Sequence, residues 1–182
     1  METVSARSLA IRNAPGLYNG RVQPIDRGLV DEVWGEILEY HPARLQMEAA
    51  AFLDQQPHVG TFTSLVGREF DDTVQRTAFG LAFLLFKVLE RSRAQSLPVL
   101  GEEPINAAYE ANVDWLATME GGEPALIEAV ESGPDLNPLS YLLSVFYEGD
   151  GDPGGYDIRV RANLYLMLKT LTEALDAGAP EG

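Results

Sequence analysis

Residues 78–86 read AFGLAFLLF, an unbroken run of nine apolar residues. Nine residues are too few to cross a bilayer, which takes about 20, so the run predicts a helix buried in a protein core. We expect this helix to begin at Asp71 or Asp72, where a carboxylate suits the positive end of the helix dipole, and to end near Ala94. Because a helix without a polar face is usually central in its fold, the other helices should pack around it. Gly80 costs about 1 kcal/mol relative to alanine inside a helix, which is tolerable where another helix crosses closely.

Apolar residues also recur at steps of three and four on both sides of this run, which is typical of amphipathic helices. They predict helices over about 26–40, 43–56, 71–94, 105–119, 124–132, 139–147 and 157–177, with 57–70 as a loop or irregular turn. Strict alternation over five residues occurs nowhere, so no strand is expected. The sequence therefore predicts an all-α protein, a six- or seven-helix single-domain bundle packed around a central apolar helix.

Length and composition set the domain organisation. A chain of 182 residues, 46% of them hydrophobic, can bury a full core without covalent staples. We expect residues 26–178 to form the single domain. Residues 1–25, rich in proline and glycine, should form an extended or mobile N-terminal arm. The chain has no cysteine, so disulfide and thiolate chemistry are excluded. Its first eight residues do not resemble a secretory signal, and we expect a soluble, cytoplasmic protein.

The charge of the chain is concentrated in one window. Residues 94–158 contain no Lys, Arg or His, yet they hold 13 of the 28 acidic residues and so account for −13 of the net charge of −15. A negative field of this size repels phosphates and anionic lipids, so we expect no binding to nucleic acid or to membranes. It attracts basic proteins instead.

The helix predicted over 105–119 carries the stripe that best suits such a partner. Its expected core face is made of Ile105, Tyr109, Val113 and Leu116. Glu103, Glu110 and Asp114 lie on the opposite side, so we interpret them as partner-binding residues. The other interpretation is a solvated outer face that favours solubility. Arginines and lysines outside the window would also allow a homodimer between an acidic and a mixed-charge side.

Two carboxylate pairs have the spacing of a metal site. Glu36 and Glu39 are three residues apart at the end of the first predicted helix, and Glu69 and Asp72 are three apart near the start of the third. Pairs on two packed helices can converge on a Mg²⁺ ion that bridges nucleotide phosphates. The ExxE and ExxD pattern is similar to that of all-α nucleotide pyrophosphohydrolases, and this resemblance implies a Mg²⁺-dependent hydrolase. Alternatively, the glutamates form an outer helix face and Asp72 caps a helix.

Two further patterns give weaker evidence for a metal site. Asp150 and Asp152 match the first and third ligands of a calcium loop, but Arg161 stands where the bidentate carboxylate of the twelfth position is required. An acidic turn is the simpler interpretation. His41 and His58 have no histidine or carboxylate three or four residues onward in metal-ligand register, so we expect ordinary polar roles for both.

A group of large side chains on the third and last predicted helices suggests another function. These residues, which could line a pocket for a small apolar ligand or simply fill the core, are Phe79, Phe83, Phe86, Tyr165 and Met167. Three functions thus follow from the sequence: a protein-interaction module, a Mg²⁺-dependent hydrolase and a helical small-ligand-binding protein. We favour the interaction module, which is not an enzyme and needs no cofactor.

Overall fold

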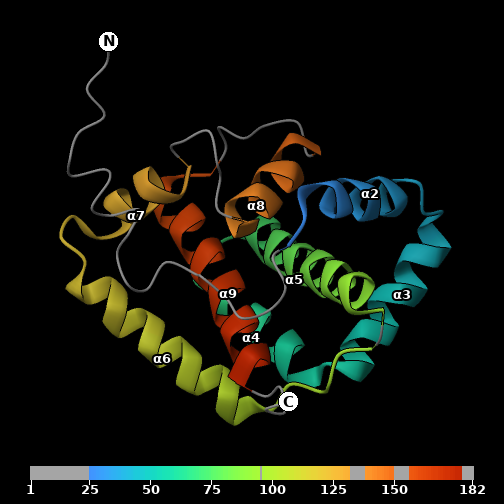
Figure 1. The fold of residues 1–182 in the computed structure, drawn as a ribbon, viewed down its shortest axis with the longest axis horizontal. Helices are drawn as coiled ribbons and strands as arrows, with labels where there is room; N and C mark the ends of the chain where they lie inside the picture. Colours follow the sequence, from blue (N-terminus) through green and yellow to red (C-terminus); the bar gives the residue numbers. More distant parts are fainter. Residues whose placement is uncertain (1–24, 95, 132–137, 150–155, 178–182) are drawn as a thin grey trace.

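The computed structural model describes residues 25–94, 96–131, 138–149 and 156–177, and within these ranges all regular structure is α-helical (Figure 1). The eight helices of these ranges are α2 (Arg27–Leu38), α3 (Pro42–Gln55), α4 (Pro57–Gly67), α5 (Asp72–Arg93), α6 (Glu102–Thr118), α7 (Gly122–Glu131), α8 (Pro138–Gly149) and α9 (Ile158–Ala177). They form one domain, as predicted. The predicted N-terminal arm lies outside the described residues except for Ile25, which is buried.

The predicted loop over 57–70 is wrong, because α4 occupies most of it. Pro57 begins α4, a position where the missing N–H costs nothing. Two glycines and two threonines lower the helix propensity of the segment, which explains the prediction. Burial of Val59 and Phe62 on one face overrides that propensity. This added helix is also why the count is eight and not six or seven.

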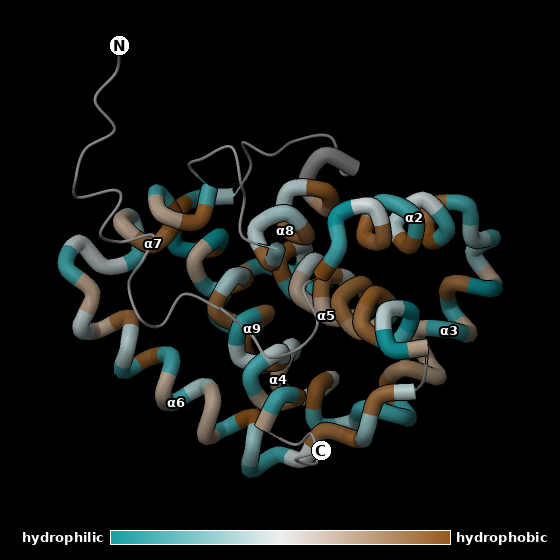
Figure 2. Tube along the Cα trace, in the orientation of Figure 1, coloured by the Kyte–Doolittle hydropathy of each residue, from teal (hydrophilic) through white to brown (hydrophobic). Residues whose placement is uncertain are grey.

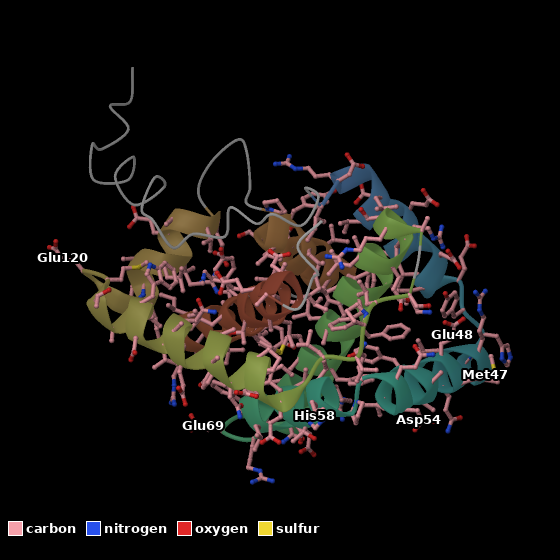
Figure 3. The ribbon with its side chains drawn as sticks, turned by 60° about the horizontal axis from the view of Figure 1, so that its bottom comes forward. Met47, Glu48, Asp54, His58, Glu69 and Glu120 are labelled. Atoms are coloured by element: carbon pink, nitrogen blue, oxygen red, sulfur yellow. The ribbon has the colours of Figure 1, made fainter. Side chains whose placement is uncertain are left out.

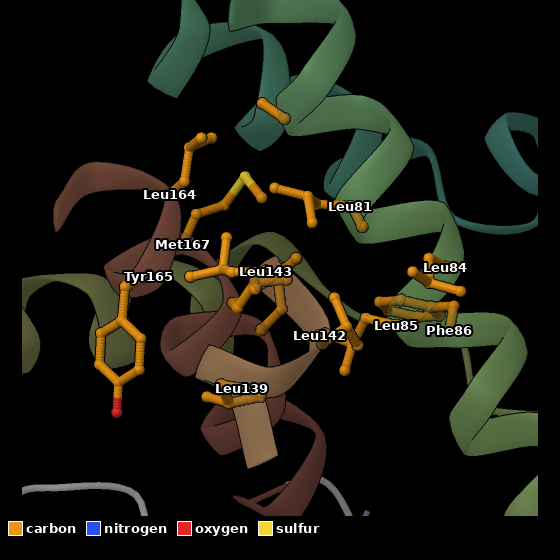
Figure 4. Packing of buried hydrophobic residues seen from close by; sticks show 14 of the residues in the cluster. Leu81, Leu84, Leu85, Phe86, Leu139, Leu142, Leu143, Leu164, Tyr165 and Met167 are labelled. Atoms are coloured by element: carbon orange, nitrogen blue, oxygen red, sulfur yellow. The ribbon is translucent and has the colours of Figure 1, made fainter. Parts of the chain in front are cut away.

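Two helices supply most of the core. The middle of α5 is buried from Leu81 to Phe86, and hydrophobic residues follow this helix through the molecule (Figure 2). α5 packs against α2, α4, α8 and α9. In α9, 13 of 20 residues are buried, so this helix too is surrounded by protein on most sides. Leucines of α5, α8 and α9 meet in one cluster (Figure 4). No helix in the described ranges is both long and apolar enough to cross a membrane.

Gly80 lies where α5 crosses α8, and the close crossing predicted for it is confirmed. A Cβ atom placed on Gly80 would lie 2.8 Å from Cζ of Phe146 in α8, closer than van der Waals contact. The Phe146 ring also packs on Trp34 of α2, with 5.2 Å between ring centroids. Glycine at position 80 therefore lets three helices approach one another.

A buried cation fixes the rotation of α6 against α9. Lys169 of α9 is only 3% exposed. Its ammonium group donates hydrogen bonds to Asn112 of α6 and to Glu173, and it lies 5.1 Å from the centre of the Trp115 ring. Because a buried charge must be compensated, Asn112 has to face inward. The core face predicted for this helix is therefore wrong at Tyr109 and Val113, which are 38% and 42% exposed.

We predict that two glycine-to-alanine changes will differ in stability. Gly35 lies in α2 with nothing within 4 Å of a Cβ atom, so Gly35→Ala should stabilise the protein by about 1 kcal/mol through helix propensity. Gly80→Ala gains the same propensity but must displace Phe146, so its free energy of unfolding should be lower than that of Gly35→Ala. Urea denaturation of both variants measures this difference. Equal stabilisation would contradict the close crossing.

Candidate functional site

A groove of about 1020 Å³ opens between α2, α3, α4, α5 and α8. Phe79, Gly80 and Phe83 of α5 lie along it, and Phe146 of α8 borders it at the helix crossing. Trp34, Ile37 and Leu38 contribute from α2, and Leu45, Ala49 and Leu53 contribute from α3. Most of these side chains are apolar, so the groove presents a hydrophobic surface to solvent.

The groove stays open because α3 buries little of its apolar face. Phe52 is the single buried residue of α3, and its ring meets those of Phe79, Phe83 and Phe86 with centroids 5.3 to 5.8 Å apart. The rest of the apolar face of α3 is incompletely covered. Leu45 and Leu53 are 41% and 42% exposed, and Leu38 across the groove is 61% exposed. Large apolar side chains grouped and exposed in this way mark interaction surfaces.

Beside the groove, a network of ion pairs ties α3 to α2 and α5. Glu48 of α3 pairs with Lys87 and with Arg44. Glu36 of α2 pairs with Arg91 at 2.6 Å and with Arg44 at 3.2 Å. The hydrogen bond from Arg91 lowers the pKa of Glu36, and the hydrogen bond from Lys87 lowers the pKa of Glu48. Both glutamates are thus stabilised as anions by protein cations.

The four carboxylates of the metal hypothesis have separate surroundings. Glu36 belongs to the ion-pair network, and Glu39 is exposed at the end of α2. Glu69 pairs with Arg159 at 3.0 Å on the surface. Asp72 borders the groove in the first turn of α5, while Asp71 caps this helix. Within the ranges that the structure describes, no three acidic or histidine side chains gather as a metal site. No contact among these residues therefore favours the hydrolase.

The two histidines and the calcium-like loop of the sequence analysis show no feature of a binding site where the structure describes them. The His41 Nδ1 atom accepts a hydrogen bond from the Ala43 N–H at the start of α3, and His58 is exposed in α4 (Figure 3). Asp150 and Asp152 of the calcium-like loop lie outside the described residues. Asp157, which follows them, accepts a hydrogen bond from the Val160 N–H as the cap of α9.

The aromatic residues proposed for a ligand pocket are divided between two places. Phe79 and Phe83 border the groove. Phe86 is buried against Phe52, and Tyr165 and Met167 are fully buried in the core cluster (Figure 4). The sequence thus identified part of the groove through α5. It missed Leu38, Leu45 and Leu53, because their helical periodicity is the same whether a face is covered or open.

The acidic residues of α6 form a second exposed surface. Glu103, Glu110 and Asp114 are all exposed, and no ion pair involves them in the part of the chain that the structure describes. We refer to these three residues as the acidic α6 face. The C-terminal end of α6 points away from α3, and Glu120, which follows α6, lies at the opposite end of the molecule from Met47 of α3 (Figure 3).

Comparison of the chain with protein-family models, curated proteins and solved structures finds no significant match. The assignment of function therefore rests on the geometry of the groove and of the acidic α6 face.

We predict that the ion-pair network makes stability depend on acid pH. The pKa values of Glu36 and Glu48 are lower in the folded state, so the network contributes fully above the ordinary Glu pKa of about 4.3. Its contribution is lost as the pH falls through the lowered folded values. Between about pH 5 and pH 3, the free energy of unfolding should fall more steeply for the native protein than for Glu48→Gln, as measured by urea denaturation.

The matched control for this prediction is Glu39→Gln, which removes a nearby exposed glutamate without an ion pair in the described residues. Its stability should follow that of the native protein across the same pH range. Parallel curves for the native protein and Glu48→Gln would show that the ion pairs of Glu48 contribute nothing to the pH dependence of stability.

Proposed function

We propose that this protein is a protein-interaction module and that the groove between α2, α3, α4, α5 and α8 is its main binding site. The observation that carries the proposal is a large apolar groove whose leucines remain exposed on a protein with a net charge of −15. Burial of such side chains by a partner is favourable by roughly 25 cal/mol for each Å² of apolar area removed from water.

The chemistry of the groove favours binding over catalysis. Of the described residues that border it, Asp72 and Arg76 carry charges and the large side chains are mostly aromatic or aliphatic. Uncharged polar residues also border it, namely Tyr40, Gln46, Thr63, Ser64 and Gln75. The apolar side chains supply contact area and shape, and the polar ones can orient a partner. Of the three phenylalanines of α5, Phe79 is partly buried, whereas Phe83 is only 4% exposed. Phe79 is therefore the contact candidate on this helix, since aromatic anchors dominate many interfaces.

Three broader expectations belong to this proposal. The bundle is organised around α5, which supplies one side of the groove. The net charge of −15 favours a partner with a basic surface, because complementary fields speed association. The absence of cysteine agrees with a cytoplasmic site of action.

The groove can be tested with Nile red, a neutral dye that fluoresces in apolar surroundings. Trp34 borders the groove, whereas Trp115 lies on α6, so a Trp115→Phe variant leaves Trp34 as the reporter. We expect saturable Nile red fluorescence with energy transfer from Trp34. Leu45→Glu should abolish both, because it places a charge on the apolar wall.

The control is Val99→Glu, which makes the same kind of change at an exposed apolar residue that does not border the groove. This variant should bind Nile red like the native protein. Equal loss of dye binding in both variants, or no saturable binding to the native protein, would refute the groove as a binding site.

The acidic α6 face is a second candidate binding surface, favoured by its three exposed carboxylates, none of which forms an ion pair with a described residue. We predict that an oligolysine peptide will bind in a salt-dependent manner. Neutralising Glu103, Glu110 and Asp114 together should weaken this binding more than neutralising Glu39, Asp54 and Glu69, which changes the net charge equally. Isothermal titration at two salt concentrations distinguishes the outcomes. Equal weakening of peptide binding in both triple variants would mean that binding depends on net charge alone.

A further inference from the structure

The groove is elongated, with two helical walls of equal length. On α3 its border runs from Pro42 to Leu53, and on α5 it runs from Asp72 to Phe83. Each span covers eleven residue steps, which is about 16 Å at the rise of an α-helix. The same length on both walls defines a trough and not a round pocket.

The two walls run in opposite directions along the trough. Glu48 near the middle of α3 pairs with Lys87 of α5, and further along α3 the ring of Phe52 packs on Phe83 and Phe79. Leu53 then reaches Gly60 of α4, where a Cβ atom would lie 2.6 Å from its side chain. The contacts of Glu48, Phe52 and Leu53 thus close the floor of the trough beneath α3. The apolar residues of α3 that border the trough face its open side.

We infer that this trough binds an amphipathic helix of about three turns from a partner protein with a basic polar face. The inference rests on the proposed function of the groove and names its partner. Three turns of helix are about 16 Å long, which matches both walls. A helix of this kind presents anchors at positions i, i+4 and i+7, which is the usual way in which helices fill apolar grooves.

The exposure of the trough argues against a small ligand as its natural occupant. Ligand pockets enclose most of the surface of a bound small molecule. Here Leu38, Leu45 and Leu53 all remain more than 40% exposed along the rim, so a small molecule would leave them in water. A helix with its side chains is wide enough to reach such a rim.

The charge of the chain argues against a second copy and for a basic helix. Two copies would bring net charges of −15 together, which is repulsive. Within the described lining, Asp72 and Arg76 balance each other, so the trough itself does not oppose a cation. Lysines or arginines on the polar face of the partner helix would be drawn by the whole protein and would not have to be buried.

The test uses three synthetic peptides of about 14 residues, or roughly four helical turns, none containing tryptophan. The first has leucines at helical spacing and lysines elsewhere. The second has the same composition in an order without helical periodicity, and the third replaces lysine by glutamate. Binding to the Trp115→Phe protein is followed by Trp34 emission and by displacement of Nile red, and helix formation by circular dichroism.

We expect the first peptide to become helical on binding, to shift Trp34 emission and to displace Nile red. The second and third peptides should bind at least about tenfold more weakly than the first. Leu45→Glu should weaken binding of the first peptide by a similar factor. Val99→Glu should leave the affinity unchanged. Leu45 is exposed, so Leu45→Glu is expected to fold, and circular dichroism of the free variant checks this.

Three results would overturn the inference. If Nile red occupies the groove but no peptide displaces it, the site takes small apolar molecules and only the helical partner is excluded. If all three peptides bind equally, neither helical periodicity nor charge is recognised. If light scattering shows that the free protein is a dimer that Leu45→Glu dissociates, a second copy is the occupant. Failure of both dye and peptide to bind would instead refute the proposed function.

Discussion

The burial of the apolar middle of α5 is the physical constraint from which much of the packing described here follows. The residues from Leu81 to Phe86 of α5 have no polar side that could face water, so neighbouring helices must cover them in every direction. α2, α4, α8 and α9 do this, and Gly80 allows α8 to come close through Phe146. Toward α3 the cover is thinner, and Phe79 is only partly buried. The groove is the place where this covering is incomplete.

The position of α3 decides the shape of the groove, and a few specific contacts set that position. Phe52 inserts among three phenylalanine rings of α5. At the end of α3, the Gln56 side chain donates to the Pro98 carbonyl and accepts from the Leu100 N–H, both at 2.9 Å. Polar contacts of this kind hold a helix in place without covering its apolar face. They leave Leu45 and Leu53 available to another molecule while α3 keeps a defined geometry.

The positions of the basic residues decide which acidic residues of the described ranges form ion pairs and which do not. Arg44, Lys87 and Arg91 join α2, α3 and α5 through glutamates, and Lys169 compensates its own burial through Glu173. Arg159 and Arg161 pair with Glu69 and Glu131. The acidic α6 face has no such partners in the described ranges. Exposed, unpaired charges act over long distances at low salt, which is why we assign the attraction of a basic partner to this face in the proposed function and the contact area to the groove.

The sequence by itself determined the helical character of the chain, the central segment of α5 and several helix ends. An apolar run bounded by charged residues, and aspartates at positions 26, 71 and 157, act through local chemistry that a sequence contains in full. Tertiary structure alone decided that 57–67 is helical, that Asn112 and not Val113 faces inward, and that the leucines of α3 stay exposed. These features depend on which helices meet and how far apart they lie. The periodicity of an apolar face is the same whether or not another helix covers it, so only the packed structure could show the groove.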